Sequence, residues 1–129
     1  MNSPENPAVP ARGTRVFVVE DEAMIRMLLE DMLGELGCTI AAAAGRIEDA
    51  LEAAKTAEFD VAVLDVNLQG QNTAAVAEAL AARSLPFVFA TGYGAHGMPE
   101  AFRDRPTLKK PFQLDALGRT LQSALSGKS

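Results

Sequence analysis

The segment DVAVLD, residues 60–65, decides the fold, because four apolar residues follow one another between two acids. A strand with one face in water alternates apolar and polar residues, whereas a strand covered on both faces is apolar throughout. RVFVV at 15–19 and PFVFA at 86–90 have the same character. CTIAAA at 38–43 and TLK at 107–109 are shorter or weaker candidates. The sequence therefore predicts five buried strands.

Helical patterns separate these strands. Four segments carry apolar residues at helical spacing: Glu22 to Leu36, Ile47 to about Glu58, Thr73 to Arg83, and Gln113 to Leu125. Gly37 is expected to end the first helix. Between the last two strands the chain is rich in helix breakers, so any helix there is expected to be short and to begin near Pro99.

Several apolar side chains are assigned to the core from their spacing. In the first helix these are Met24, Met27 and Met32. In the last helix Leu114, Leu117, Leu121 and Leu125 fall on one face, and Cys38 is expected to fill the core beside the second strand.

Strands that alternate with helices predict an α/β fold, a doubly wound five-stranded parallel sheet in the order 2-1-3-4-5. The domain is expected to span 14–126, between a flexible N-terminal tail at 1–13 and a C-terminal tail at 127–129. Sheets of this kind bind ligands beyond the carboxyl ends of their strands, where the strand order reverses. Here that point lies between the first and third strands.

The composition narrows the functional classes. The net charge is −5, whereas nucleic acids and anionic membranes bind basic surfaces, so neither is expected as a partner. A single cysteine excludes an internal disulfide and a cysteine-based zinc site. No apolar run approaches the roughly 20 residues needed to span a bilayer, and we expect a cytoplasmic protein.

Polar side chains follow the predicted strands at the edge where a ligand would bind. Glu20 and Asp21 follow the first strand, Asp65 ends the third, Thr91 follows the fourth and Lys110 follows the fifth. Three clustered carboxylates repel one another unless a cation compensates them. Mg²⁺ prefers oxygen ligands, so Asp21 and Asp65 are candidate direct ligands, with Glu20 acting through a water and a backbone carbonyl beyond Asp65 completing the set.

An acidic Mg²⁺ site of this kind suits phosphoryl transfer. The carboxylate of Asp65 can act as the nucleophile and form an aspartyl phosphate. The ammonium of Lys110 and the hydroxyl of Thr91 are then placed to bind the phosphoryl oxygens. Gly92 leaves room for the phosphoryl group to approach the backbone.

The chain resembles the receiver domain of two-component response regulators, a flavodoxin-like fold. The resemblance is carried by VFVVED (16–21), VLDVNL (63–68), FATG (89–92) and LKKPF (108–112). It implies the following roles: Asp65 as phosphoacceptor, Glu20 and Asp21 in the acidic pocket, Asn67 as a metal ligand through its carbonyl, Thr91 as the switch hydroxyl, Lys110 as the phosphate-binding lysine, and a cis bond before Pro111.

FATGYG, residues 89–94, resembles a narrower branch of single-domain receivers from alphaproteobacteria. The aromatic residue that most receivers carry three positions before the lysine is replaced here by Thr107. Tyr93 is a candidate substitute, and Asn67 and Tyr93 are expected to set the rate of self-dephosphorylation. We also expect residues 92–103 to be mobile and to become ordered on phosphorylation.

The resemblance implies a stand-alone, monomeric phosphoacceptor switch that is not an enzyme beyond its own phosphorylation and dephosphorylation. Its expected partners are a histidine kinase or histidine phosphotransferase, docking on the first helix, and a downstream protein. The alternatives are a phosphate sink, a scaffold that takes no phosphate, and an aspartyl-phosphate hydrolase. Such hydrolases place a second acid two residues after the nucleophile, where this chain has Asn67.

For single residues, simpler interpretations remain open. Glu20 and Asp21 can be first-turn acids that favour the helix dipole. Strand alternation directs Lys109 away from Lys110, and His96 is expected to be a solvated side chain in a glycine-rich loop.

Overall fold

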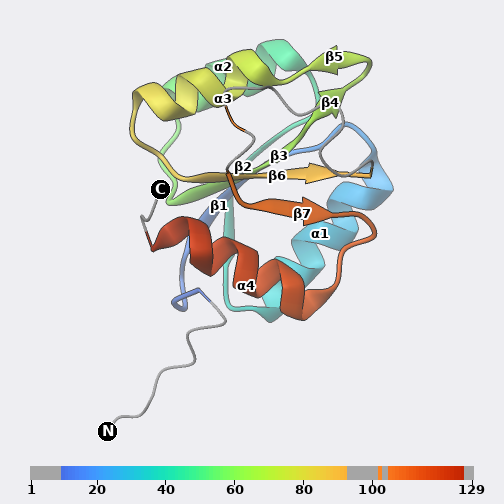
Figure 1. The fold of residues 1–129 in the computed structure, drawn as a ribbon, viewed down its shortest axis with the longest axis vertical. Helices are drawn as coiled ribbons and strands as arrows, with labels where there is room; N and C mark the ends of the chain where they lie inside the picture. Colours follow the sequence, from blue (N-terminus) through green and yellow to red (C-terminus); the bar gives the residue numbers. More distant parts are fainter. Residues whose placement is uncertain (1–9, 93–101, 103–104, 127–129) are drawn as a thin grey trace, which may run out of the picture.

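A five-stranded parallel sheet forms the centre of the computed structural model, which describes residues 10–92, 102 and 105–126 (Figure 1). Its strands are β1 (Arg15–Val19), β2 (Thr39–Ala44), β3 (Val61–Asp65), β6 (Phe87–Thr91) and β7 (Thr107–Lys109). They lie in the order β2-β1-β3-β6-β7, which confirms the predicted order 2-1-3-4-5. The predicted strand bounds are correct to within one residue at each end.

Four helices cover the sheet: α1 (Ala23–Glu35), α2 (Ile47–Thr56), α3 (Ala74–Ala82) and α4 (Leu114–Leu125). The helices α2 and α3 lie on one face, and α1 and α4 lie on the other (Figure 1). Within β1, Phe17 and Val19 belong to the first core cluster, whereas Val16 and Val18 belong to the second. Both faces of the sheet are therefore core, which explains why its central strands are apolar throughout.

The prediction for the methionines of α1 is wrong for two of three. Met24 is 83% exposed and Met27 is 61% exposed, whereas Leu29 and Leu33 fill the core. Met32 packs against that core and is partly buried. Two sets of apolar residues in α1 have helical spacing, one with Met24 and Met27 and the other with Leu29 and Leu33. Periodicity alone does not show which of these two stripes faces the sheet.

The prediction for α4 needs a smaller correction. Leu117 and Leu121 are fully buried, as expected, but Leu114 is 38% exposed at the start of the helix. Cys38 is buried among the side chains between α1 and the sheet, which confirms its assignment to the core. Gly37 follows Leu36, the C-cap of α1, and has a φ of +88°, which is the left-handed conformation expected of a residue that ends a helix.

The segment between β3 and α3, for which the sequence pattern predicts neither a strand nor a helix, forms an antiparallel hairpin of β4 (Asn67–Leu68) and β5 (Gln71–Asn72). Its two-residue turn is Gln69-Gly70, with φ angles of 53° and 84°. Two positive φ angles are typical of the type I′ turn that joins twisted strands. Leu68 is fully buried, so the hairpin is anchored in the core.

Two predictions cannot be compared with the described residues: the short helix near Pro99, and the mobility of residues 92–103, of which 93–101 and 103 are not described. Among the helices that the structure describes, none has the length and apolar character that crossing a membrane requires.

Candidate functional site

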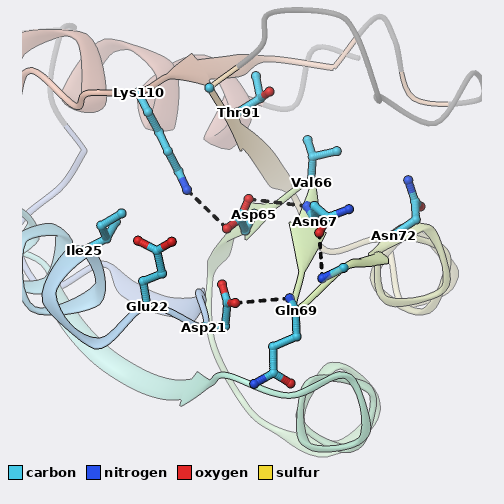
Figure 2. Close-up of a pocket in the computed structure, with 12 residues that line it drawn as sticks. Asp21, Glu22, Ile25, Asp65, Val66, Asn67, Gln69, Asn72, Thr91 and Lys110 are labelled. Carbon is cyan, nitrogen blue, oxygen red and sulfur yellow. Dashed lines mark hydrogen bonds and ion pairs between the residues drawn. The ribbon is translucent and has the colours of Figure 1, made fainter.

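The parallel register of the sheet brings the predicted site residues to one edge. Val19 of β1 lies opposite Leu64 of β3, so Glu20 and Asp65 follow at the same level. Asp65 lies opposite Ala90, which places Thr91 one residue further along β6. Asp65 and Thr91 border a pocket of about 610 Å³ that Asp21, Asn67, Gly92 and Lys110 also line (Figure 2).

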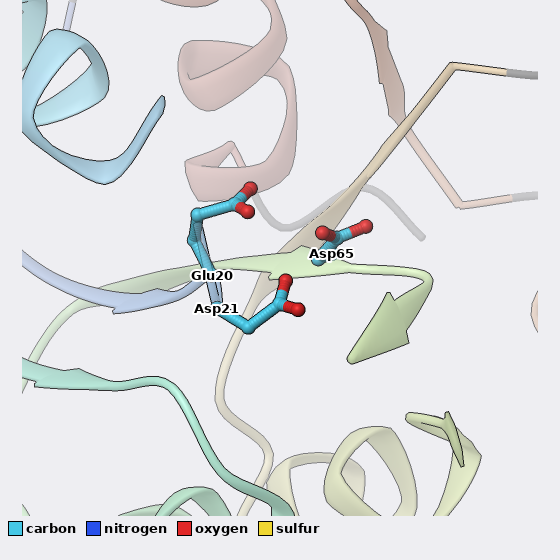
Figure 3. A group of neighbouring side chains, drawn as sticks. All are labelled: Glu20, Asp21 and Asp65. Carbon is cyan, nitrogen blue, oxygen red and sulfur yellow. The ribbon is translucent and has the colours of Figure 1, made fainter. Parts of the chain in front are cut away.

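Three carboxylates meet at this edge. Glu20, Asp21 and Asp65 each offer an oxygen, and these oxygens all lie within 4.8 Å of one another (Figure 3). Glu20 is 2% exposed and Asp65 is also buried. The helix α1 begins at Ala23, so Glu20 and Asp21 both precede its first turn. The interpretation of these two residues as first-turn acids is therefore wrong.

Lys110 supplies the compensating charge among the described residues. Its Nζ lies 3.2 Å from Oε1 of Glu20 and 3.2 Å from Oδ2 of Asp65. Burial lowers the pKa of Lys110, but the charges of Asp65 and Glu20 outweigh it and leave that pKa raised. Lys110 is therefore cationic at neutral pH. Lys109 is exposed, in agreement with the prediction that it points away.

The carboxyl group of Asp65 is destabilised in its charged form. Burial is the main cause, and together with the neighbouring Glu20 it raises the pKa of Asp65 to about 6, although Lys110 acts in the opposite direction. A carboxylate with this pKa is ionised at neutral pH but less stable than one in water. The site therefore favours any bound group that adds positive charge beside Asp65.

Glu20 is held at both of its carboxylate oxygens. Oε1 accepts from Lys110, and Oε2 accepts a hydrogen bond of 3.0 Å from the backbone N–H of Glu22, the residue before α1. Arg26 Nη1 donates to the backbone carbonyl of Glu20 at 3.3 Å. These contacts fix Glu20 at the base of the acidic group.

The hairpin contributes contacts that the sequence analysis missed. The backbone N–H of Gln69 donates to Oδ2 of Asp21 at 3.1 Å, and the N–H of Asn67 donates to Oδ1 of Asp65 at 3.4 Å (Figure 2). Every residue except proline has a backbone N–H, so the sequence does not show which of these groups contact the site. The glycine in NLQGQN is the one signal that a tight turn lies here.

Thr73 is a second residue that was missed. Its buried hydroxyl lies 2.7 Å from the carbonyl oxygen of Asp65 and 3.1 Å from that of Val66. Its position directly before α3 favours a capping role, but its side chain makes no capping hydrogen bond there. Thr73 instead holds the backbone that carries Asp65.

Thr91 and Gly92 border the pocket where β6 ends. Thr91 is buried, and its carbonyl accepts from the N–H of Lys110 at 2.9 Å. A Cβ added at Gly92 would meet nothing within 4 Å, so the described protein atoms do not themselves exclude a side chain there. Tyr93 and His96 lie outside the described residues.

The peptide bond after Lys110 agrees with one expectation, and Thr107 at the start of β7 lies at a position where this chain departs from the family. The peptide bond between Lys110 and Pro111 is cis, as the resemblance implies. Thr107, at the position where most receivers have an aromatic residue, is exposed, and its hydroxyl donates to the carbonyl of Arg105 at 3.1 Å.

The donor set fits a divalent cation. Three carboxylates and one ammonium leave a local charge of −2, which one divalent ion balances. All the side-chain donors are oxygens, which hard cations such as Mg²⁺ prefer. The described residues therefore fit Mg²⁺ better than a soft transition metal.

The response regulator receiver domain is a family whose sequence model matches residues 16–122 of this chain. The chain belongs to this family. Its fold, its acidic group and the lysine beside that group accord with the match, and the chain is thus a receiver domain of two-component signalling.

Known relatives support this membership. The transcriptional regulatory protein PdtaR of Mycobacterium tuberculosis is 32% identical over 130 residues, which cover 98% of this receiver and 63% of PdtaR. This receiver thus spans less than two thirds of that curated relative. The solution structure of SdrG from Sphingomonas melonis Fr1 is 42% identical, covers 91% of this receiver and 99% of the SdrG chain, and has a TM-score of 0.79.

A second structure of SdrG shows its BeF3-activated conformation. It is 43% identical, covers 90% of this receiver and 99% of that chain, and has a TM-score of 0.75. The similarity to SdrG is consistent with the resemblance of FATGYG to alphaproteobacterial single-domain receivers.

Proposed function

We propose that this receiver accepts a phosphoryl group on Asp65 in a Mg²⁺-dependent reaction and signals through protein contacts. The observation that carries the proposal is the environment of Asp65. This carboxylate ends β3 at the pocket, beside two further acids, and Lys110 Nζ lies 3.2 Å from its Oδ2. A nucleophile between a cation site and a fixed ammonium is the arrangement that phosphoryl transfer requires.

In the reaction, a carboxylate oxygen of Asp65 forms a bond to phosphorus while the bond from phosphorus to the donor breaks. When the donor is a phosphohistidine, the leaving imidazole nitrogen keeps the electron pair of that bond and takes up a proton. The product is an acyl phosphate on Asp65. Because Asp65 attacks as a carboxylate, its own proton must already be lost, which the pKa of about 6 allows at neutral pH.

Asp21, Asp65 and the backbone carbonyl of Asn67 would hold Mg²⁺ directly. Glu20, which Lys110 and the backbone N–H of Glu22 hold in place, would act through a water. When bound, Mg²⁺ supplies positive charge that the carboxylates and the phosphoryl oxygens share.

Lys110 and Thr91 would bind the phosphoryl oxygens. Lys110 already reaches Asp65, so its ammonium needs little movement to follow the oxygens of the new group. Thr91 presents a hydroxyl at the end of the adjacent strand, and Gly92 leaves the approach open. Pro111 follows Lys110 through a cis peptide bond.

A histidine kinase or histidine phosphotransferase is the proposed donor, and α1 is its proposed docking surface. Met24, Met27 and Leu28 form an exposed apolar stripe on this helix. Ile25 in the first turn of this helix and Glu22 directly before it line the pocket. A donor bound along this stripe would therefore lie next to the pocket that contains Asp65.

The comparisons favour a signalling role over catalysis on a separate substrate. Receiver domains are mostly switches, and the related SdrG has been solved in an activated conformation. Asn67 lies where an aspartyl-phosphate hydrolase needs a second acid, and an amide cannot exchange a proton in that role. Phosphate-sink and scaffold roles are distinguished from the switch by the next experiment.

The proposal is tested by incubating the receiver with acetyl phosphate, with Mg²⁺ or with EDTA, and measuring intact mass. We expect one phosphoryl adduct that needs Mg²⁺, that borohydride reduction maps to Asp65, and that Asp65→Asn abolishes. An unmodified protein in the presence of Mg²⁺ would contradict the proposal and favour a scaffold. An adduct without any change in the amide NMR spectrum beyond the pocket would favour a sink.

A further inference from the structure

We propose that the β4–β5 hairpin is a positioning element for the divalent cation, because the backbone N–H of Gln69 holds the carboxylate of Asp21 toward the acidic group. This inference rests on the Mg²⁺ site of the proposed function. It assigns a role to the turn of the hairpin, whereas Asn67 is the hairpin residue already expected at the site. Figure 2 shows the hairpin beside the pocket, with Gln69 bound to Asp21.

The conformation of the turn is unusual at the residue that makes this contact. Gln69 has a φ of 53°, in the left-handed region that residues with side chains rarely adopt. Strain of this kind persists only where surrounding contacts determine it, and it is concentrated at functional sites. The N–H of the strained residue lies 3.1 Å from Oδ2 of Asp21, 48 positions earlier in the sequence.

The hairpin is held rigidly enough to act as a support. Leu68 is fully buried, and Oδ1 of Asn67 accepts from the N–H of Gly70 at 2.9 Å, which closes the turn. At its far end, the N–H of Thr73 donates to the carbonyl of Val66 at 3.1 Å. The segment that presents Gln69 is therefore fixed to the same strand end that carries Asp65.

Asp21 differs from the other two acids in how it is held. Glu20 and Asp65 both contact Lys110, whereas the hydrogen bond described for the Asp21 carboxylate comes from Gln69. A carboxylate has two oxygens, so Oδ2 can accept from the hairpin while Oδ1 binds the ion. Groups that orient a metal ligand in this way change metal affinity about 10–100-fold when they are lost.

The test compares two glycines with matching geometry. Gly70 has a φ of +84° and Gly13 a φ of +86°, and a Cβ at either position would meet nothing within 4 Å. Valine is strained at both positions for the same reason, but Gly13 lies in the turn before β1, away from the pocket. Mg²⁺ affinity is measured by amide NMR titration of wild type, Gly70→Val and Gly13→Val, without any phosphodonor.

We expect Gly70→Val to weaken Mg²⁺ binding by about tenfold and Gly13→Val to leave it unchanged. In an Asp21→Ala background, Gly70→Val should have no further effect on affinity, because the hairpin acts through Asp21. Gln69→Gly keeps the N–H and removes the strain, so it should bind Mg²⁺ as the wild type does.

Three outcomes would overturn the inference: equal Mg²⁺ affinity in wild type and Gly70→Val, equal weakening in Gly13→Val, or weakening that persists without Asp21. A wild type that binds no Mg²⁺ would instead refute the proposed function. Amide hydrogen exchange gives a second measurement, independent of the metal and of how Gly70→Val folds. The Gln69 amide should be protected in wild type and exchange at least several-fold faster in Asp21→Ala, and an unchanged rate would contradict the contact.

Discussion

At the scale of single residues, the electrostatics of Asp65 decide what the site can do. Burial makes its charge unfavourable, Glu20 adds repulsion, and Lys110 offsets only part of both effects. The carboxylate is therefore a better nucleophile and metal ligand than a solvated aspartate of ordinary pKa. Keeping this unfavourable charge in the folded protein lowers its free energy of unfolding.

This cost predicts a dependence of stability on pH. The pKa of Asp65 is about 6 in the folded protein and near 3.8 when unfolded, so between these values the folded state binds the extra proton. The free energy of unfolding should then fall as pH rises from about 4 to 7. Asp65→Asn should remove this loss and be more stable than wild type at pH 7 by about 3 kcal/mol in EDTA.

Urea unfolding of both proteins at pH 5 and pH 7.5 measures the effect. The advantage of Asp65→Asn should grow with pH in EDTA and shrink when Mg²⁺ is added, because the ion compensates the wild-type carboxylate. Equal stability of the two proteins at both pH values would show that Asp65 is not destabilised by its surroundings.

At the scale of elements, periodicity identified every strand of the main sheet and all four described helices, but not the orientation of α1. Leu29 and the exposed Met27 lie in neighbouring stripes with the same spacing, and only packing against the sheet distinguishes them. The hairpin was missed because its strands have two residues each and its turn is Gln-Gly rather than the usual Asn-Gly. Short elements carry too little pattern to be predicted.

The two stripes of α1 should respond differently to substitution. Met27→Glu alters an exposed side chain, so the free energy of unfolding should change by less than about 0.5 kcal/mol. Leu29→Ala removes a buried side chain and should cost about 2–5 kcal/mol. Urea unfolding measures both variants.

The rate of phosphotransfer distinguishes a defect in kinase docking from a defect in folding. Met27→Glu should be phosphorylated by acetyl phosphate at the wild-type rate, because the pocket is unchanged. It should accept phosphate from a phosphorylated histidine kinase at least several-fold more slowly, because a charge interrupts the apolar stripe. Wild-type rates with both donors would exclude this face of α1 as the docking surface.

At the scale of the whole molecule, the topology of the sheet assembles the site. Glu20, Asp65, Thr91 and Lys110 come from four separate strand ends, and the order β2-β1-β3-β6-β7 brings them to one edge. The strand order determines which residues at the carboxyl ends of the strands become neighbours. This part of the site could therefore be predicted from the sequence. The contacts of Gln69 and Thr73 could not, since they depend on backbone geometry between the strands.

The central claim is that Asp65 is a working phosphoacceptor whose modification is sensed at the adjacent strand ends. Its most direct test is the amide NMR spectrum on addition of beryllofluoride, with and without Mg²⁺, for wild type and Asp65→Asn. We predict Mg²⁺-dependent shifts at Asp65, Thr91 and Lys110 that the mutation abolishes. A wild-type spectrum that does not respond, or an equal response in Asp65→Asn, would contradict the claim.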